Sequence, residues 1–100
     1  METYLNTGIR IKVIVEIKAL AVKHDIQKVI LFGSRARGDY KERSDIDLAI
    51  TGGKGDLFAL DVDEGTSTLL MYDIVNLDRA VQAELLEAIQ REGVVIYEKV

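Results

Sequence analysis

The sequence predicts an α/β fold, and three observations support it. Short apolar runs typical of strands occur at residues 28–32, 43–51, 69–77 and 94–97. Two longer segments, 9–24 and 79–92, place apolar residues at helical spacing. Proline is absent from the 100 residues, so no obvious linker divides them. We therefore expect residues 1–100 to form one domain, a compact α/β sandwich.

Composition narrows the class of protein. With 48% apolar and 30% charged residues, no apolar run of about 18 residues and no signal peptide, a globular protein of the cytoplasm is expected. Without cysteine, any metal ion must be held by oxygen ligands, which favours Mg²⁺ or Mn²⁺. The net charge of −4 argues against broad binding to nucleic acid and excludes no local basic patch.

The first segment, 9–24, has two competing periods. Alternating isoleucines and valines fit a half-buried strand, whereas Ile9, Val13 and Ile17 form a stripe at helical spacing. The length of about sixteen residues favours a helix. A second apolar stripe at Ile11, Val15 and Val22 means either that this helix is buried on two sides or that it docks another subunit, so an oligomer is possible.

The remaining elements follow in order. The run 28–32 predicts a central strand, 34–37 one helical turn ended by Gly38, 39–44 a polar loop, and 43–51 a second strand. Residues 54–67 are the least regular, with one helical turn expected at 57–60 and a turn at 64–65. A third strand is expected at 69–77. Asp78 then caps a helix over 79–92 that Gly93 stops, and 94–97 forms a fourth, edge strand.

The candidate site lies where the first two strands approach each other. The first strand ends at Gly33-Ser34, where a sharp turn leaves free amides that suit phosphate oxygens. The second strand carries Asp45 and Asp47, two residues apart and therefore on the same face. We therefore expect a phosphate-binding turn beside a binding site for a divalent metal ion.

Asp73 is a candidate third acid. It interrupts an otherwise apolar strand, and a carboxylate there needs a cation or hydrogen-bond donors. Alone it could equally be a solvated residue on an edge strand or the partner of an arginine. Beside the Asp-x-Asp pair, a metal-ligating role is favoured.

These residues resemble a known family. Gly33-Ser34, then ten residues, then Asp45-Ile46-Asp47, with Asp73 on a later strand, is similar to the minimal nucleotidyltransferases of the DNA polymerase beta-like nucleotidyltransferase superfamily, including antitoxins of the MntA type. The resemblance covers about residues 9–98. It implies a small mixed sheet of about four strands flanked by helices, and transfer of a nucleoside monophosphate, usually AMP from ATP, with release of pyrophosphate.

The resemblance also implies roles for particular residues. Asp45, Asp47 and Asp73 would be catalytic and bind two Mg²⁺ ions, with Mn²⁺ as a substitute. Gly33 and Ser34 would hold the triphosphate of ATP or another NTP. The nearby arginines would offset its charge, which gives the nucleotide-binding candidates Arg35, Arg37 and Arg43. Members of this family commonly pair with a helical HEPN or substrate-binding protein, often as the antitoxin of a toxin–antitoxin pair.

Other interpretations of these residues are possible. The spacing of Gly33 and Gly38 fits a P-loop, but Asp39-Tyr40 stands where Lys-Ser/Thr is required, so a P-loop NTPase is rejected. Tyr40 could stack on a base. The alternative function is a non-catalytic binding module that neutralises a helical partner by docking.

Overall fold

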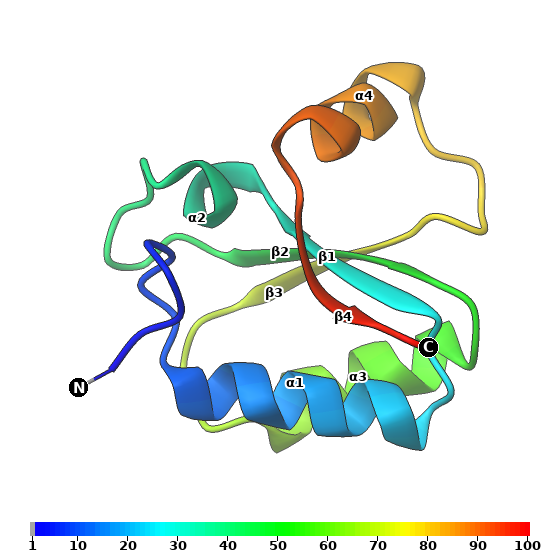
Figure 1. Cartoon of the computed structure of the whole chain (residues 1–100), viewed down its shortest axis with the longest axis horizontal. Coiled ribbons are helices and arrows are strands. Elements are labelled where there is room, and N and C mark those ends of the chain that lie inside the picture. The colour runs from blue at the N-terminus through cyan, green and yellow to red at the C-terminus, as the bar shows by residue number, and fades with distance from the viewer. Residues whose placement is uncertain (1) are drawn as a thin grey trace.

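A four-stranded mixed sheet forms the centre of the computed structural model, which describes residues 2–100 (Figure 1). The strands are β1 (Lys28–Phe32), β2 (Ile46–Thr51), β3 (Tyr72–Asn76) and β4 (Val94–Glu98), in the order β3-β2-β1-β4. β1 pairs antiparallel with β2 and β4, whereas β2 and β3 are parallel. The predicted mixed sheet of four strands flanked by helices is confirmed.

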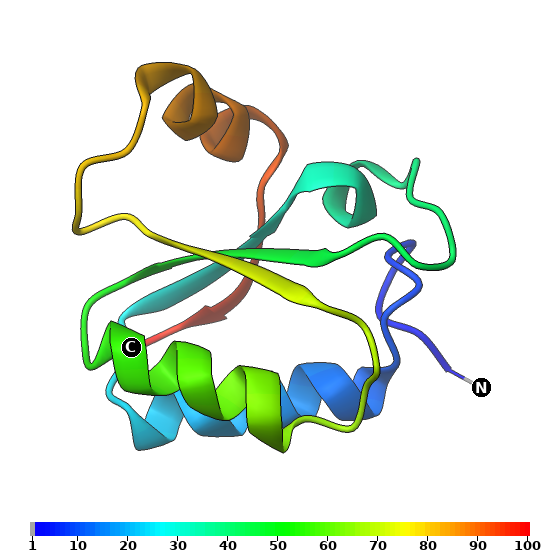
Figure 2. The same ribbon diagram turned by 180° about the vertical axis from the view of Figure 1, so that it is seen from behind.

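Four helices lie on the two faces of this sheet. They are α1 (Ile11–Lys23), α2 (Gly33–Arg37), α3 (Gly55–Gly65) and α4 (Ala83–Glu92). Figures 1 and 2 show α1 and α3 side by side along one face, which we call the closed face, and α2 and α4 above the other, the open face. No helix within residues 2–100 is long and apolar enough to cross a membrane.

Most of the core lies on the closed face. Alternation along β2 directs Leu48 and Ile50 toward α1 and α3, where Phe58 and Val62 of α3 are fully buried. The open face has a much smaller core, in which Phe32, Ala49 and Ile89 of α4 pack together. The sheet is therefore held mainly from one side.

The first segment is a helix, as its length predicted. The stripe of Val13 and Ile17 is buried against the sheet. The second stripe faces solvent, because Ile11, Val15 and Val22 are 39%, 58% and 64% exposed. The interpretation of a helix buried on two sides is wrong within the single chain.

Helix α3 was not predicted at its true length. Only one turn was expected around Leu57, but eleven residues form a helix that ends at Gly65. Its buried stripe consists of Phe58 and Val62, while Leu57 and Leu60 are about half exposed. The apolar residues of α3 therefore do not all lie on one face, and the helical pattern in the sequence is weak.

A polar contact connects α1 to α3. His24 Nε2 and Asp61 Oδ2 lie 2.6 Å apart and tie the end of α1 to α3.

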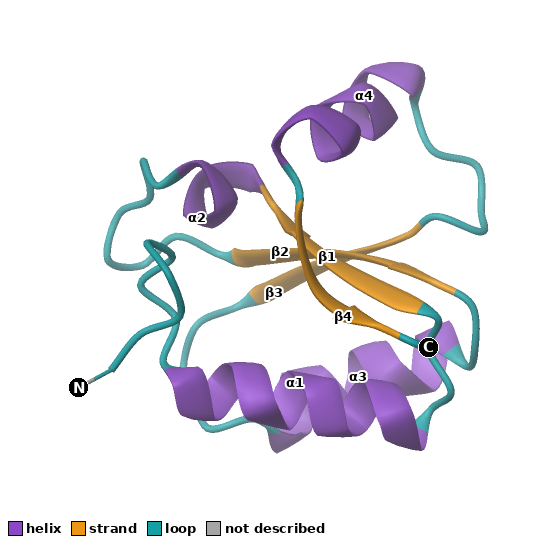
Figure 3. Ribbon diagram, in the orientation of Figure 1, coloured by secondary structure: helices purple, strands orange, loops and turns teal. Residues whose placement is uncertain are grey.

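Several boundaries also differ from the prediction. β2 begins at Ile46 and β3 at Tyr72, each three residues later than expected, since the preceding residues are irregular (Figure 3). α4 begins at Ala83, so Asp78 does not cap it. Asp78 instead accepts hydrogen bonds from Thr51 Oγ1 (2.6 Å) and Gly52 N (2.7 Å), which closes the turn after β2.

Candidate active site

Gly33 and Asp47 form the centre of the site. β1 ends at Phe32, whose register partner on β2 is Asp47, so the next residue, Gly33, lies against the Asp47 side chain. Gly33 has φ +76°, and a Cβ atom there would overlap the Asp47 carboxylate. Glycine is therefore required both by the backbone conformation and by the close approach of the carboxylate.

The other two predicted acids lie beside Asp47. Asp73 is its register partner in the parallel pairing of β2 with β3. Asp45 immediately precedes β2, and alternation places it, like Asp47 and Asp73, on the open face. Asp47 is partly buried, whereas Asp45 and Asp73 are exposed. The structure thus brings all three residues to one end of one sheet face.

The charges of these acids are coupled. Burial, followed by the negative charges of Asp73 and Asp45, raises the pKa of Asp47 to about 6, although Arg37 and Arg35 oppose this shift. Like charges that raise a carboxyl pKa in this way leave a local excess of negative potential. Such an excess favours a bound cation.

The chemistry of these donors fits a hard divalent cation, because all three are carboxylates. Within residues 2–100, however, no group of three acidic, histidine or cysteine side chains is close enough to hold an ion as it stands. The three carboxylates therefore share a face and an end of the sheet without forming a ready-made three-ligand set.

Ser34 and Arg37, two of the predicted phosphate contacts on α2, differ in their exposure and contacts. Ser34 follows Gly33 directly and is partly buried. Arg37 is exposed, and its guanidinium pairs with Asp39 (3.1 Å) and with Glu92 of α4 (3.1 Å). Arg37 thus joins α2 to α4 across the open face.

Arg43 lies on the loop before β2. It is exposed and lines a cavity of about 460 Å³ together with Leu69, Leu70 and Met71. Leu69 and Met71 are 102% and 65% exposed. This apolar edge immediately precedes the strand that carries Asp73.

Arg35 lies in a different environment from the other predicted phosphate contacts. It is only 2% exposed, and burial lowers the pKa of its guanidinium. Its donors are directed at backbone carbonyl oxygens, and its guanidinium lies 4.8 Å from the centre of the Tyr40 ring. Tyr40 therefore packs against Arg35. The sequence had suggested a different contact for this ring, stacking on a base.

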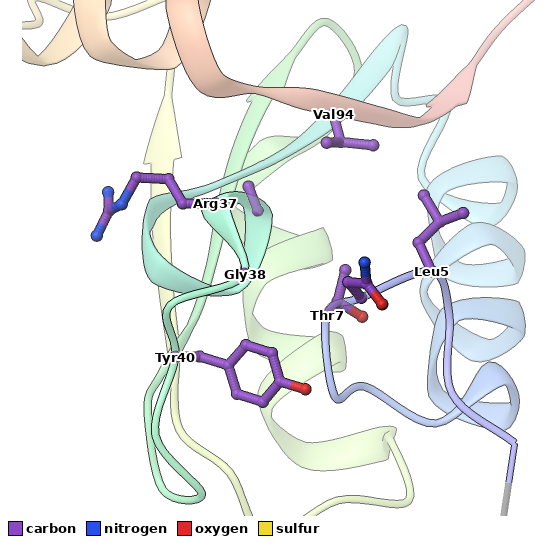
Figure 4. A pocket seen from close by; sticks show the side chains of 8 residues that line it. Leu5, Thr7, Arg37, Gly38, Tyr40 and Val94 are labelled. Atoms are coloured by element: carbon purple, nitrogen blue, oxygen red, sulfur yellow. The ribbon is translucent and has the colours of Figure 1, made fainter.

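A second cavity, of about 490 Å³, lies between α2 and the N-terminal segment. Figure 4 shows Tyr40 and Gly38 facing Leu5 and Thr7 of the N-terminal segment, with Val94 of β4 above them. None of the three carboxylates lines it. Of the predicted site residues, only Arg37 lines this cavity.

One residue that supports the site was missed by the sequence analysis. Glu16 of α1 accepts hydrogen bonds from Ser67 N (2.8 Å) and Ser67 Oγ (2.7 Å), and Arg10 also bonds to the Ser67 carbonyl. These contacts fix the segment that leads into β3 and Asp73. In the sequence, Glu16 is indistinguishable from any other acid on the polar side of a helix.

The comparisons with known proteins agree with this geometry. The family model described as "Polymerase beta, Nucleotidyltransferase" matches residues 15–100. "Putative protein adenylyltransferase MJ0604" of Methanocaldococcus jannaschii is 48% identical over 61 residues, which are 61% of this chain and 58% of that protein. The chain thus spans little more than half the length of this curated relative.

Solved structures share the fold. A "Crystal structure of the toxin-antitoxin with AMP-PNP" superposes with a TM-score of 0.68 at 21% identity, over 86% of this chain and 73% of that one. A "Structure of putative minimal nucleotidyltransferase" superposes with a TM-score of 0.61 at 28% identity, over 81% of this chain and 86% of that one. Both likenesses extend across most of the sheet and its helices.

Proposed function

The chain belongs to the polymerase beta nucleotidyltransferase family, and from that premise we propose that it is a Mg²⁺-dependent nucleotidyltransferase that transfers AMP from ATP to a protein. The observation that carries this proposal is the acid cluster of Asp45, Asp47 and Asp73, whose central member, Asp47, lies against Gly33. The name of the relative MJ0604 supports a protein acceptor.

In this reaction a hydroxyl oxygen of the acceptor attacks the α-phosphorus of ATP, and the bond to the oxygen that bridges the α and β phosphates breaks. Pyrophosphate leaves with that bridging oxygen. Divalent ions held by Asp45, Asp47 and Asp73 would neutralise the charge on the attacking and leaving oxygens. Asp73 is exposed at the edge of the sheet and would accept the proton of the attacking hydroxyl.

The residues of α2 would position the triphosphate. Gly33 lets the Asp47 carboxylate lie directly against the start of α2, and the Ser34 hydroxyl would donate a hydrogen bond to a phosphate oxygen. Arg37 and Arg43 would offset the phosphate charge. Arg37 would then exchange part of its pairing with Asp39 and Glu92 for a phosphate contact.

The experiment incubates the purified chain with Mg²⁺, ATP labelled at the α-phosphate, and the product of the neighbouring open reading frame. We expect label on that product, release of pyrophosphate, and loss of both with Asp47→Asn. An Asp47→Asn variant that labels at the parental rate contradicts the proposal. Transfer to a helical HEPN or substrate-binding partner would support a role as the antitoxin of a toxin–antitoxin pair, consistent with the toxin–antitoxin structure that shares the fold.

A second candidate function has one observation in its favour. The exposed residues Ile11, Val15 and Val22 of α1 form an apolar stripe that a partner or a second copy could cover. A tight complex with the neighbouring product, without transfer of label, would support a non-catalytic docking module instead.

A further inference from the structure

Arg35 stands apart from the rest of the proposed site because it is buried and its guanidinium bonds to backbone. Nε donates to the Ser44 carbonyl (3.0 Å), and Nη1 donates to the Thr7 carbonyl (2.9 Å). Nη2 donates to the Glu42 carbonyl (3.1 Å). The planar guanidinium thus donates to carbonyl oxygens of two separate segments, the N-terminal segment at Thr7 and the loop at 42–44.

The segment that Arg35 binds is the turn directly before Asp45. This turn is closed at its ends, because Lys41 N donates to Ser44 Oγ (2.8 Å) and Ser44 N donates to the Lys41 carbonyl (3.0 Å). Arg35 adds hydrogen bonds to the carbonyl oxygens of Glu42 and Ser44. The turn contains no regular secondary structure, so these contacts determine its position.

Asp45 needs such support because it lies outside β2. The sheet begins at Ile46, whose amide bonds to the Met71 carbonyl, and Asp47 and Asp73 are held within paired strands. The backbone of Asp45 is instead fixed through its neighbour, Ser44, whose carbonyl accepts the Nε bond of Arg35.

We propose that Arg35 is a positioning residue, which holds the turn at 41–44 so that Asp45 lies beside Asp47 and Asp73 for metal binding. This assignment rests on the proposed function, and it differs from the phosphate contact that the sequence suggested for Arg35. The Tyr40 ring, 4.8 Å from the guanidinium, completes the pocket that keeps Arg35 away from solvent.

The test compares Arg35→Lys, which keeps the charge but loses the fork, with the parent. The matched control is Arg79→Lys, an exposed arginine paired with Asp56 at 2.9 Å. The readouts are Mn²⁺ affinity, alone and with α,β-methylene-ATP, the affinity for α,β-methylene-ATP without metal, and amide hydrogen exchange of residues 39–45. All are measured well below the melting temperature of every variant.

We expect Arg35→Lys to bind Mn²⁺ roughly tenfold more weakly, as is usual when a residue that orients a metal ligand is changed. Exchange at 39–45 should become faster, and Arg79→Lys should match the parent. Ser44→Ala, which opens the same turn without touching Arg35, should shift both readouts in the same direction. It serves as the test if Arg35→Lys does not fold.

Three results would overturn the assignment. Unchanged Mn²⁺ affinity in Arg35→Lys, or in Ser44→Ala if Arg35→Lys is unfolded, shows that the contacts serve stability only. Unchanged Mn²⁺ affinity with weaker binding of metal-free α,β-methylene-ATP shows that Arg35 contacts phosphate. A parent chain that binds no Mn²⁺ under either condition overturns the proposed function itself, and the assignment with it.

Discussion

The two faces of the sheet differ in how they are filled. On the closed face, α1 and α3 cover a continuous apolar core that includes Leu48 and Phe58. On the open face, α4 covers only a small cluster around Phe32 and Ile89, and the end of the sheet beside it carries Asp47 and Asp73. The difference indicates that stability comes mostly from one side of the sheet, which leaves the other side free to hold charge.

The largest expected effect tests the closed face. Phe58→Ala removes a fully buried aromatic ring from α3 and should lower the free energy of unfolding by about 3–4 kcal/mol. Leu85→Ala, on α4 and only partly buried, should cost about 1 kcal/mol. Urea unfolding of both variants measures the comparison. Equal losses would show that the faces contribute alike.

The next effect tests the charge on the open face. Asp47 has a pKa of about 6 in the folded chain against 3.8 for an ordinary aspartate, so the folded state binds more protons between these values. Its contribution to stability is present at low pH and is lost as pH rises through about 6.

Asp47→Asn should therefore stabilise the chain at about pH 8 without divalent ions, by at most about 2 kcal/mol. The gain should vanish near about pH 4, and thermal unfolding across this range measures it. Addition of Mg²⁺ should stabilise the parent more than the variant. A variant less stable than the parent at the higher pH would remove the electrostatic basis of the comparison.

A smaller effect concerns the contact between Glu16 of α1, on the closed face, and Ser67, which precedes β3. Glu16→Gln retains an acceptor for Ser67 N, but toward Ser67 Oγ it presents an NH2 that donates, so two bonds to a charged carboxylate become bonds to a neutral amide. We expect a loss of about 1 kcal/mol in unfolding free energy. Hydrogen exchange of residues 67–72 should accelerate, because this segment leads into β3. Unchanged exchange there would mean that Glu16 does not support the position of Asp73.

The smallest effect concerns the outer side of α1. The double variant Val15→Ser, Val22→Ser changes exposed residues and should alter the free energy of unfolding by no more than about 0.5 kcal/mol per site. Mn²⁺ binding should equal that of the parent. Loss of complex formation with the neighbouring product, with binding of Mn²⁺ retained, would place the partner interface on the closed-face helices.

The elements with clear apolar patterns were predictable from the sequence. The run 28–32 matched β1, and Gly38 ended α2 with φ +90°. Helix α3 was missed because its buried stripe is only two large residues wide and its many acids resemble a solvated turn. The start of α4 was placed too early, since Asp78 is used to close the turn after β2.

The site was predictable in part for a similar reason. Glycine and paired acids are visible in a sequence, and the structure places Gly33, Asp47 and Asp73 together. The role of Arg35 was not visible, because a buried arginine and a phosphate-binding arginine look the same within the run from Ser34 to Arg37. The difference depends on which carbonyls the fold brings to the guanidinium.

The parallel pairing of β2 with β3 has a consequence for how the chain folds. β1 and β2 are consecutive strands, separated only by α2 and a loop, so the pairing that brings Gly33 to Asp47 is relatively local. Asp73 joins them only after the intervening chain, α3 included, has crossed the opposite face of the sheet. The full set of acids therefore comes together only when β3 has paired with β2, so assembly of the site depends on the same crossover that places α3 on the core.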